Sequence, residues 1–267
     1  MIDKIIKDLE LNLNIKINKE DIIYYTDGAT DSIVFNINNK YLIKTLDENT
    51  YNTQIEFLNF YKEIPNFQKV IHSNKDLNYI CFEFIPGTKY SSSNIDHTKT
   101  INKLYNITKQ YKEYNHNYYG YLYEDKKTWI EFLNSEIEYS YSKIKDLNIN
   151  LDKINNAIST LDKYQKPKYL IHGDFGTHNF ITNGDTLNVI DPMPVVGDYL
   201  YDFYFSIFSD TDIYTTTTIE ELLKYYDREI EVKKAMITIT FFIRMSRAFV
   251  YDKENFDTYL KYYNEVI

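Results

Sequence analysis

Apolar and polar positions in the first third of the chain follow a strand-like pattern. A short amphipathic helix is expected first, over residues 2–11. Five runs rich in β-branched and aromatic residues then predict strands at residues 22–25, 33–37, 41–46, 67–72 and 79–85. Asn38-Asn39-Lys40 is a polar hairpin turn, and the segment 50–63 has a helical period that Pro65 ends. This order predicts a five-stranded antiparallel sheet with one inserted helix.

The pattern changes at the breaker pair Pro86-Gly87. Helical periods follow at residues 96–117, 128–147 and 151–163, and the chain from Tyr199 onward is mostly helical. Three short strand candidates lie at residues 169–171, 180–182 and 187–190. We therefore predict an α+β protein with a sheet-containing domain at 1–86 and a mainly helical domain at 87–267.

Composition narrows the range of partners. The chain has 267 residues, 43% of them hydrophobic, which is enough to bury a sizeable core. Its formal charge is −9 and it has no basic run, so nucleic acid is not expected as a partner. Cys81 is the single cysteine, which fits a reducing cytoplasm. Neither the charged start at residues 1–8 nor the apolar stretch 235–245 predicts a signal peptide or a membrane span.

The strongest chemical signal is the segment from Leu170 to Asp191. Asp174 and Asn179 are five residues apart on a loop between two predicted strands, and Asp191 follows the next strand. A hairpin brings its two ends together, so Asn179 and Asp191 are expected to face one site. Phosphoryl transfer needs such groups, because one carboxylate orients the attacking hydroxyl while amide and carboxylate oxygens hold Mg²⁺.

The segment 169–205 also resembles a known family, the aminoglycoside phosphotransferases and their choline-kinase-like relatives, and is closest to the hygromycin-type enzymes. The resemblance lies in His172-Gly173-Asp174 with Asn179, and in Ile190-Asp191, Gly197-Asp198 and Tyr201-Asp202. It implies a two-lobed, protein-kinase-like fold that uses Mg²⁺ and ATP or GTP as the phosphoryl donor. The domain at 1–86 would then bind the nucleotide, and the domain at 87–267 would carry the catalytic and acceptor-binding groups.

The resemblance also assigns roles to single residues. Asp174 corresponds to the catalytic carboxylate, and Asn179 and Asp191 to the metal ligands. Lys44, on the third predicted strand, resembles the lysine that holds the α- and β-phosphates, with Glu56 as its partner. The sequence departs from the family at Pro192, where an aromatic residue is usual; proline leaves the carboxylate of Asp191 in place.

Further positions are implied for the nucleotide and the acceptor. The turn from Gly28 to Ser32 resembles the nucleotide loop, although it lacks a GxGxxG pattern, and the backbone of Glu83 and Ile85 resembles the hinge that holds adenine. Asp198 and Asp202 either bind cationic groups of the acceptor or hold backbone N–H groups near the catalytic loop. No role is assigned to His178.

A cationic, hydroxyl-rich acceptor such as an aminoglycoside antibiotic fits the acidic chain and the resemblance, and would make the protein a resistance enzyme. A kinase of choline, an amino sugar or methylthioribose is the first alternative. A metal-dependent hydrolase is another, because His172, Asp174, His178 and Asp191 include side chains that can bind a transition metal. A nucleotide-binding regulator without turnover is the third.

Overall fold

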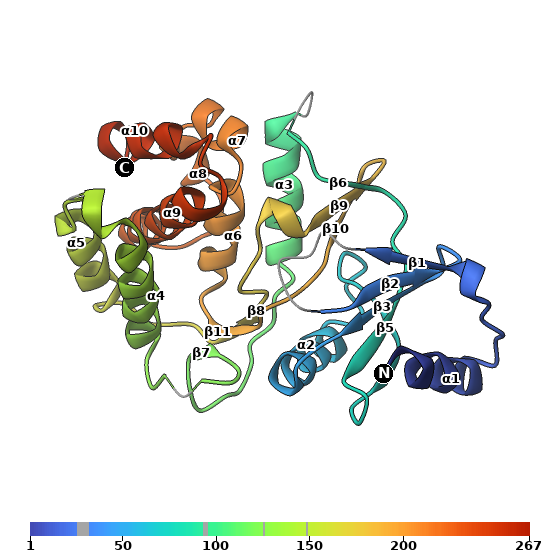
Figure 1. Ribbon diagram of the computed structural model, residues 1–267. Helices are drawn as coiled ribbons and strands as arrows, with labels where there is room; N and C mark the ends of the chain where they lie inside the picture. Colours follow the sequence, from blue (N-terminus) through green and yellow to red (C-terminus); the bar gives the residue numbers. More distant parts are fainter. Residues whose placement is uncertain (26–31, 93–95, 125, 148) are drawn as a thin grey trace. The chain divides into compact units, whose positions relative to one another are not determined.

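The computed structural model describes residues 1–25, 32–92, 96–124, 126–147 and 149–267. The chain forms two compact units (Figure 1). The first unit consists of Met1–Tyr90 and Asn179–Met193, and the second consists of Ser91–His178 and Pro194–Ile267. The chain thus leaves the first unit and later returns to it. The expected division into residues 1–86 and 87–267 did not include the second segment of the first unit, and it stays a prediction.

A five-stranded antiparallel sheet is the centre of the first unit. Its strands are β1 (Ile22–Tyr25), β2 (Val34–Ile37), β3 (Tyr41–Thr45), β4 (Val70–Asn74) and β5 (Tyr79–Glu83), in the order β1-β2-β3-β5-β4. Asn38, Asn39 and Lys40 connect β2 to β3, and the two asparagines have φ values of 55° and 51°. Asparagine tolerates this left-handed conformation, and the Lys40 N–H closes the turn by donating to the Ile37 carbonyl at 3.0 Å. The predicted sheet and hairpin are confirmed.

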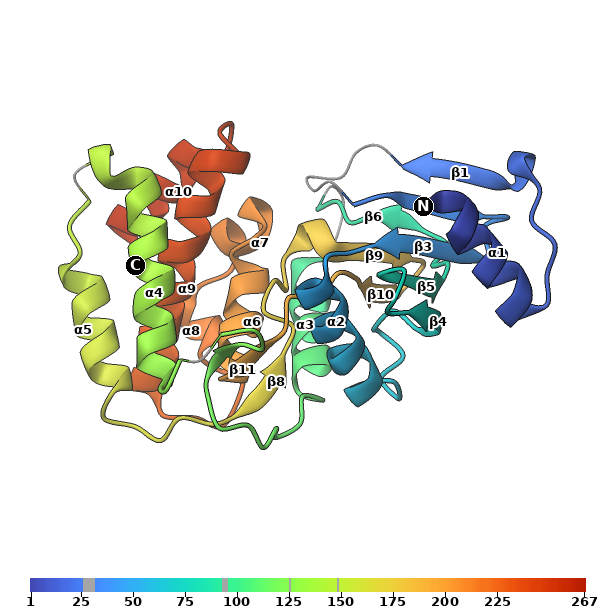
Figure 2. The ribbon, with the colours of Figure 1, turned by 60° about the horizontal axis from the view of Figure 1, so that its bottom comes forward.

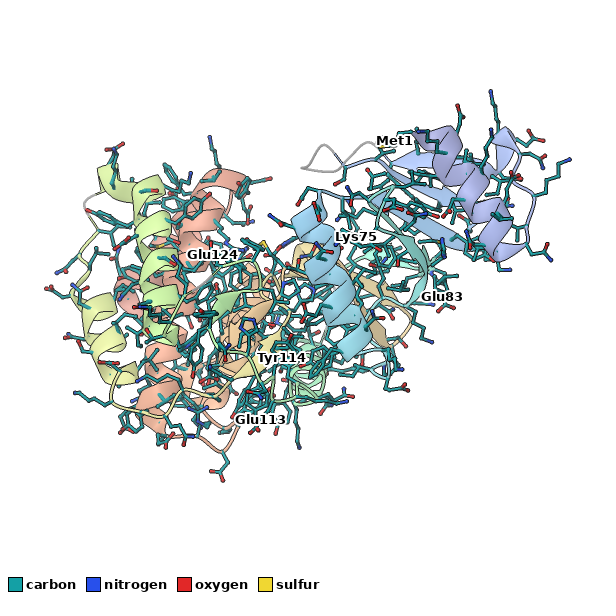
Figure 3. The ribbon with its side chains drawn as sticks, turned by 90° about the horizontal axis from the view of Figure 1, so that it is seen from below. Met1, Lys75, Glu83, Glu113, Tyr114 and Glu124 are labelled. Carbon is teal, nitrogen blue, oxygen red and sulfur yellow. The ribbon has the colours of Figure 1, made fainter. Side chains whose placement is uncertain are left out.

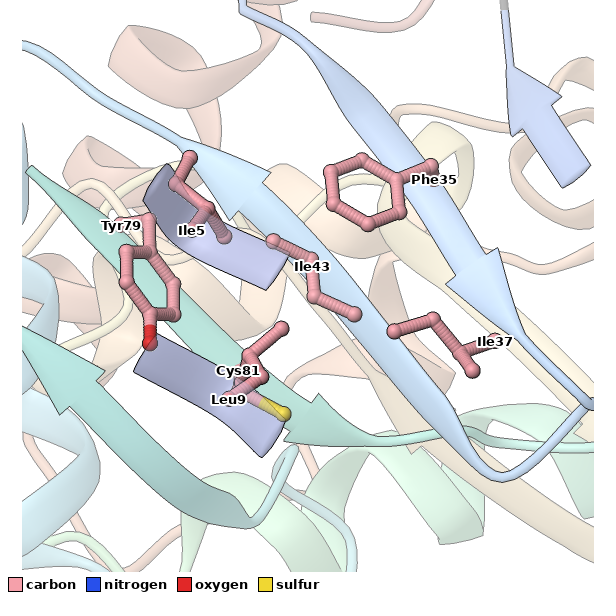
Figure 4. Packing of buried hydrophobic residues seen from close by; sticks show 7 residues of the cluster. All are labelled: Ile5, Leu9, Phe35, Ile37, Ile43, Tyr79 and Cys81. Atoms are coloured by element: carbon pink, nitrogen blue, oxygen red, sulfur yellow. The ribbon is translucent and has the colours of Figure 1, made fainter. Parts of the chain in front are cut away.

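Helix α1 (Ile2–Leu13) covers one face of this sheet (Figure 4). Its apolar side chains Ile5 and Leu9 are fully buried. They pack against a cluster contributed by β2, β3 and β5, namely Phe35, Ile37, Ile43, Tyr79 and Cys81. Successive side chains of a strand point to opposite faces, so Lys44 beside Ile43 belongs to the other face.

The first unit also contains the helix α2 and several shorter elements. Helix α2 (Glu48–Phe60) is the expected inserted helix, and the Asp47 carboxylate caps it by accepting a hydrogen bond from the Thr50 N–H at 3.0 Å. A second sheet has the order β10-β9-β6. The remaining bounds are η1 (Lys19–Asp21), β6 (Thr88–Lys89), β9 (Phe180–Asn183) and β10 (Thr186–Val189). The short helix η3 (Thr177–Asn179) carries the chain into this returning hairpin.

The second unit is mainly helical, as expected. Its helices are α3 (His97–Thr108), α4 (Trp129–Ile144), η2 (Lys145–Leu147), α5 (Asp152–Leu161), α6 (Tyr199–Ile207), α7 (Thr211–Thr216), α8 (Ile219–Leu222), α9 (Ile230–Tyr251) and α10 (Phe256–Glu265). Its strands are β7 (Gly120–Tyr121), β8 (Tyr169–Ile171) and β11 (Val195–Gly197), in the order β7-β11-β8. Helix α9 packs against α4, α5, α6 and α10 (Figure 2). None of the described helices combines the length and apolar character needed to cross a bilayer.

One expected helix is shorter in the structure than in the prediction. The periodic pattern extended over 96–117, but α3 ends at Thr108. Buried Tyr111 follows the helix and donates its hydroxyl to Asp202 at 2.7 Å. Tertiary packing of Tyr111 therefore outweighs the local preference for continuing the helix.

Candidate active site

The hairpin β9–β10 brings two predicted metal ligands to adjacent backbone positions. Phe180 pairs with Val189, and the Ile190 N–H donates to the carbonyl of Asn179 at 3.0 Å. Asn179 therefore stands beside Ile190, and Asp191 follows directly. This pairing, contained in the first unit, places the two residues at the end of one hairpin, and their role as metal ligands stays a prediction.

Lys44 and Asp191 form an ion pair within the first unit. The Lys44 Nζ lies 2.5 Å from Asp191 Oδ1, and the two side chains are 16% and 42% exposed. Strand β3 places Lys44 in register with Val34 and Ile80 of its neighbours. Asp191 has φ 59°, a left-handed conformation that aspartate adopts more readily than most residues. The half-exposed carboxylate is thus fixed beside a positive charge.

Gln54 of α2 contacts the same carboxylate, and sequence reasoning missed it. Its Nε2 donates to Asp191 Oδ1 at 2.7 Å and to the carbonyl of Pro192 at 3.1 Å. Gln54 is 2% exposed, whereas Glu56 on the same helix is exposed. A polar residue at a helical spacing from buried Tyr51 was the available signal. The partnership of Glu56 with Lys44 stays a prediction.

The remaining nucleotide positions stay predictions as well. Gly28 lies outside the described residues. Ser32 is half-buried and precedes Ile33, whose N–H donates to the Thr45 hydroxyl at 2.9 Å. Glu83 has an exposed side chain at the end of β5 (Figure 3), and its N–H donates to the Lys69 carbonyl at 2.9 Å. The Glu83 N–H is therefore occupied within the sheet.

In the second unit, Asp202 holds the backbone that precedes Asp174. Its carboxylate is fully buried and accepts the N–H groups of His172 at 2.7 Å and Gly173 at 3.0 Å. Burial raises the pKa of Asp202 to about 7, although these bonds and the Tyr111 hydroxyl oppose the rise. Gly173 has φ 80°, which favours glycine. Asp202 thus fixes the backbone of the two residues that directly precede Asp174.

Asp198 is also buried and engaged. It caps α6 by accepting the Leu200 N–H at 3.0 Å, and its Oδ2 lies 3.3 Å from the Arg228 guanidinium. Burial raises the pKa of Asp198 against the opposing charge of Arg228. We therefore propose the second of the two expected roles, the holding of backbone N–H groups, for both Asp198 and Asp202.

Asp174 is held at both carboxylate oxygens. Arg247 Nη1 donates to Oδ1 at 2.9 Å, and His178 Nε2 lies 2.9 Å from Oδ2. Burial alone would raise the pKa of Asp174, but the hydrogen bond and charge of His178 and the charge of Arg247 outweigh it and hold the pKa well below its usual range. Asp174 is therefore ionised at neutral pH.

Glycine at position 176 makes room for His178. A Cβ added at Gly176 would lie 2.7 Å from Cε1 and 2.8 Å from Nδ1 of the imidazole ring. Such distances require the ring to shift. The His178 ring can therefore occupy the position that reaches Asp174 because residue 176 has no side chain.

Glu136 and Tyr121 complete the surroundings of Asp174. Arg247 Nη2 lies 3.7 Å from Glu136 Oε2, and the Tyr121 hydroxyl donates to Glu136 Oε1 at 3.2 Å. Burial raises the pKa of Glu136 against the charge of Arg247. No short motif connects these residues with Asp174 in the sequence, and only the packing of α4 and α9 reveals them.

The described residues contain no group of three or more His, Cys, Asp or Glu side chains arranged to hold a metal ion. The metal-dependent hydrolase needs such a set from His172, Asp174, His178 and Asp191. That alternative therefore gains no support from the described side chains. A site for Mg²⁺ does not require such a cluster, because phosphate oxygens and water complete its coordination.

The fold is the α+β, protein-kinase-like fold of small-molecule phosphotransferases. No protein family and no curated protein matches the sequence. A streptomycin–ATP complex of the aminoglycoside phosphotransferase APH(2")-IIa is 17% identical with a TM-score of 0.57, covering 100% of this chain and 97% of that one. A putative fructosamine-3-kinase from Haemophilus somnus is 14% identical with a TM-score of 0.61, covering 98% and 92%. The choline kinase LicA from Streptococcus pneumoniae is 19% identical with a TM-score of 0.54, covering 98% and 96%.

Proposed function

We propose that the protein is a kinase that transfers the γ-phosphoryl group of a nucleoside triphosphate to a hydroxyl group of a small molecule. The observation that carries this proposal is the Lys44–Asp191 pair at the end of the hairpin that also presents Asn179. An ammonium group beside two oxygen donors suits a triphosphate and its metal ion. The fold shared with proteins crystallised with nucleotides supports the same donor.

Asn179 and Asp191 fit Mg²⁺ because both offer hard oxygen donors. Lys44 and Gln54 both contact Asp191 Oδ1, and Oδ2 would serve as the donor to the metal ion. When bound, the ion would neutralise negative charge on the β- and γ-phosphate oxygens. Lys44 would add positive charge on the phosphates, and Gln54 would keep the carboxylate of Asp191 in place.

Asp174 would act on the acceptor. Its ionised carboxylate would accept a hydrogen bond from the acceptor hydroxyl and thereby direct the oxygen toward the γ-phosphorus. The new O–P bond forms as the bond between the γ-phosphorus and the β,γ-bridging oxygen breaks, the hydroxyl proton passes to Asp174, and the nucleoside diphosphate leaves. The transition state of such transfers is loose, so orientation contributes more than the strength of the base.

The proposed acceptor is cationic and rich in hydroxyl groups, as an aminoglycoside is. The formal charge of −9 would attract such a ligand, and a protein of the same fold was crystallised with streptomycin. We further propose that the protein works in the cytoplasm with ATP or GTP. Fructosamine and choline kinases share the fold, and their acceptors are therefore the natural comparison in an assay.

The test is a transfer assay on the purified protein with ATP and GTP, using a panel of aminoglycosides, choline and glycated amines. Asp174→Asn is the control and should lower kcat by ~10²–10⁴ while nucleotide Kd stays within a few fold, because the carboxylate touches the acceptor. Transfer to no acceptor, or normal turnover by Asp174→Asn, would contradict the proposed function.

The charge of the acceptor is tested separately with a salt series. Attraction between partly exposed charges is screened over ~8–10 Å at ordinary ionic strength, so KM for a cationic acceptor should rise with salt. A KM for the preferred acceptor that does not respond to salt would refute the cationic class and leave the kinase assignment intact.

A further inference from the structure

Arg247 joins the candidate catalytic carboxylate to two other elements of the second unit. It lies on α9, 73 residues from Asp174 in sequence, and its Nη1 donates to Asp174 Oδ1 at 2.9 Å. Its Nη2 lies 3.7 Å from Glu136 Oε2 on α4. The Arg247 side chain is 21% exposed and so is partly removed from water. One planar cation therefore bridges two carboxylates from separate segments.

The guanidinium is also held from its flat side. Its central carbon lies 4.7 Å from the centre of the Phe205 ring on α6, a distance at which a cation is attracted to an aromatic face. The Tyr121 hydroxyl fixes Glu136 at 3.2 Å. Arg247 consequently has little freedom to leave Asp174, because carboxylates contact the edge of its guanidinium group and Phe205 contacts the flat face.

Stability alone does not explain this arrangement. Removing an ion pair from water costs hydration free energy, and the attraction between the charges often only partly offsets this cost. Apolar residues of similar volume therefore often stabilise the fold equally well. The geometry instead directs one guanidinium N–H at the oxygen whose orientation matters for transfer.

We propose that Arg247 is a positioning residue that fixes the Asp174 carboxylate in the orientation needed to receive the acceptor hydroxyl. The inference rests on the proposed function. Arg247 anchors Oδ1 and His178 contacts Oδ2, so the carboxyl plane is set by two partners. Glu136 acts one step further away, because it restrains Arg247.

The experiment compares Arg247→Ala and Arg247→Lys with a matched pair at Arg244. Arg244 lies on the same helix and its guanidinium carbon is 5.1 Å from the centre of the same Phe205 ring, whereas the hydrogen bond to Asp174 comes from Arg247. Arg247→Ala should lower kcat about 10- to 100-fold, because small misplacements of reacting groups have effects of this size. Nucleotide Kd should stay within a few fold. Millimolar guanidinium should restore part of the lost kcat in Arg247→Ala.

Arg244→Lys should lower the thermal midpoint without a comparable loss of kcat. If Arg247→Ala fails to fold, Arg247→Lys decides: reduced kcat with normal nucleotide Kd supports the inference, and wild-type kcat overturns it. Equal losses of kcat in the two lysine variants also overturn it, since stacking on Phe205 would then explain both. An inactive wild-type protein would refute the proposed function itself, whereas an active wild type with an unaffected Arg247→Ala refutes this inference alone.

Discussion

The buried carboxylate of Asp202 should make stability depend on pH in a direction opposite to that of an aspartate whose pKa is lowered on folding. Its pKa is about 7 in the folded protein, against 3.8 as its ordinary value. Between these values the folded state holds a proton that the unfolded chain has released. The folded state then binds more protons, so the free energy of unfolding falls as pH rises through this window and levels off above it.

The magnitude follows from the two pKa values. The slope reaches about 1.4 kcal/mol per pH unit and fades near pH 7, which gives a loss of about 2 kcal/mol between about pH 5.5 and pH 8. Asp202→Asn has no proton to release and should not show this loss. It has a separate, pH-independent cost of ~1–3 kcal/mol, because its amide N–H₂ faces the backbone N–H groups of His172 and Gly173.

Urea unfolding at a series of pH values measures the difference. Trp129 is the single tryptophan and is buried in the second unit, so its fluorescence reports on the unit that contains Asp202. The contributions of groups that titrate alike in both proteins cancel when the unfolding free energy of Asp202→Asn is subtracted from that of the wild type. A difference in unfolding free energy that does not change with pH would refute the reasoning, since Asp202 would then titrate at its ordinary pKa.

Three further experiments test the site. Asp191→Ala should abolish Mg²⁺-dependent nucleotide affinity in calorimetry, and an unchanged metal dependence would place the metal elsewhere. Gln54→Leu should weaken nucleotide binding more than Glu56→Gln, because the Gln54 amide contacts the Asp191 carboxylate from a buried position; the reverse ranking of Kd would favour Glu56 as the key helix residue. Gly176→Ala should displace the His178 ring and lower kcat about tenfold at a nearly normal thermal midpoint, and wild-type kcat would show that the ring position is unimportant.

Local patterns carried most of what the sequence could predict. The strands around Lys44 and the hairpin that places Asn179 beside Ile190, next to Asp191, depend on alternation and turn residues within a few positions of one another. A short window of the sequence is enough to recognise such signals. Strands β6, β7 and β11, with two or three residues each, are too short to have a period, and they were not predicted.

Contacts between distant segments were beyond sequence reasoning. Gln54 and Asp191 are 137 positions apart, and Arg247 and Asp174 are 73 apart. Arginine inside an apolar helix predicts burial of a charge but does not identify the partner. The roles of Asp198 and Asp202 were left open for the same reason, because N-capping and backbone holding become distinct from acceptor binding only when burial is known.

The return of the chain to the first unit has a consequence for biosynthesis. The ribosome completes Met1–Tyr90 about a hundred residues before Asn179–Met193 emerge. At ~5–20 residues per second, the nascent unit waits about 5–20 s for the hairpin that carries Asp191. During this interval β6 has no β9 to pair with, and Lys44 has no carboxylate from that segment. The nascent first unit should therefore remain exposed to chaperones and proteases until the first segment of the second unit, Ser91–His178, and the hairpin after it have been synthesised.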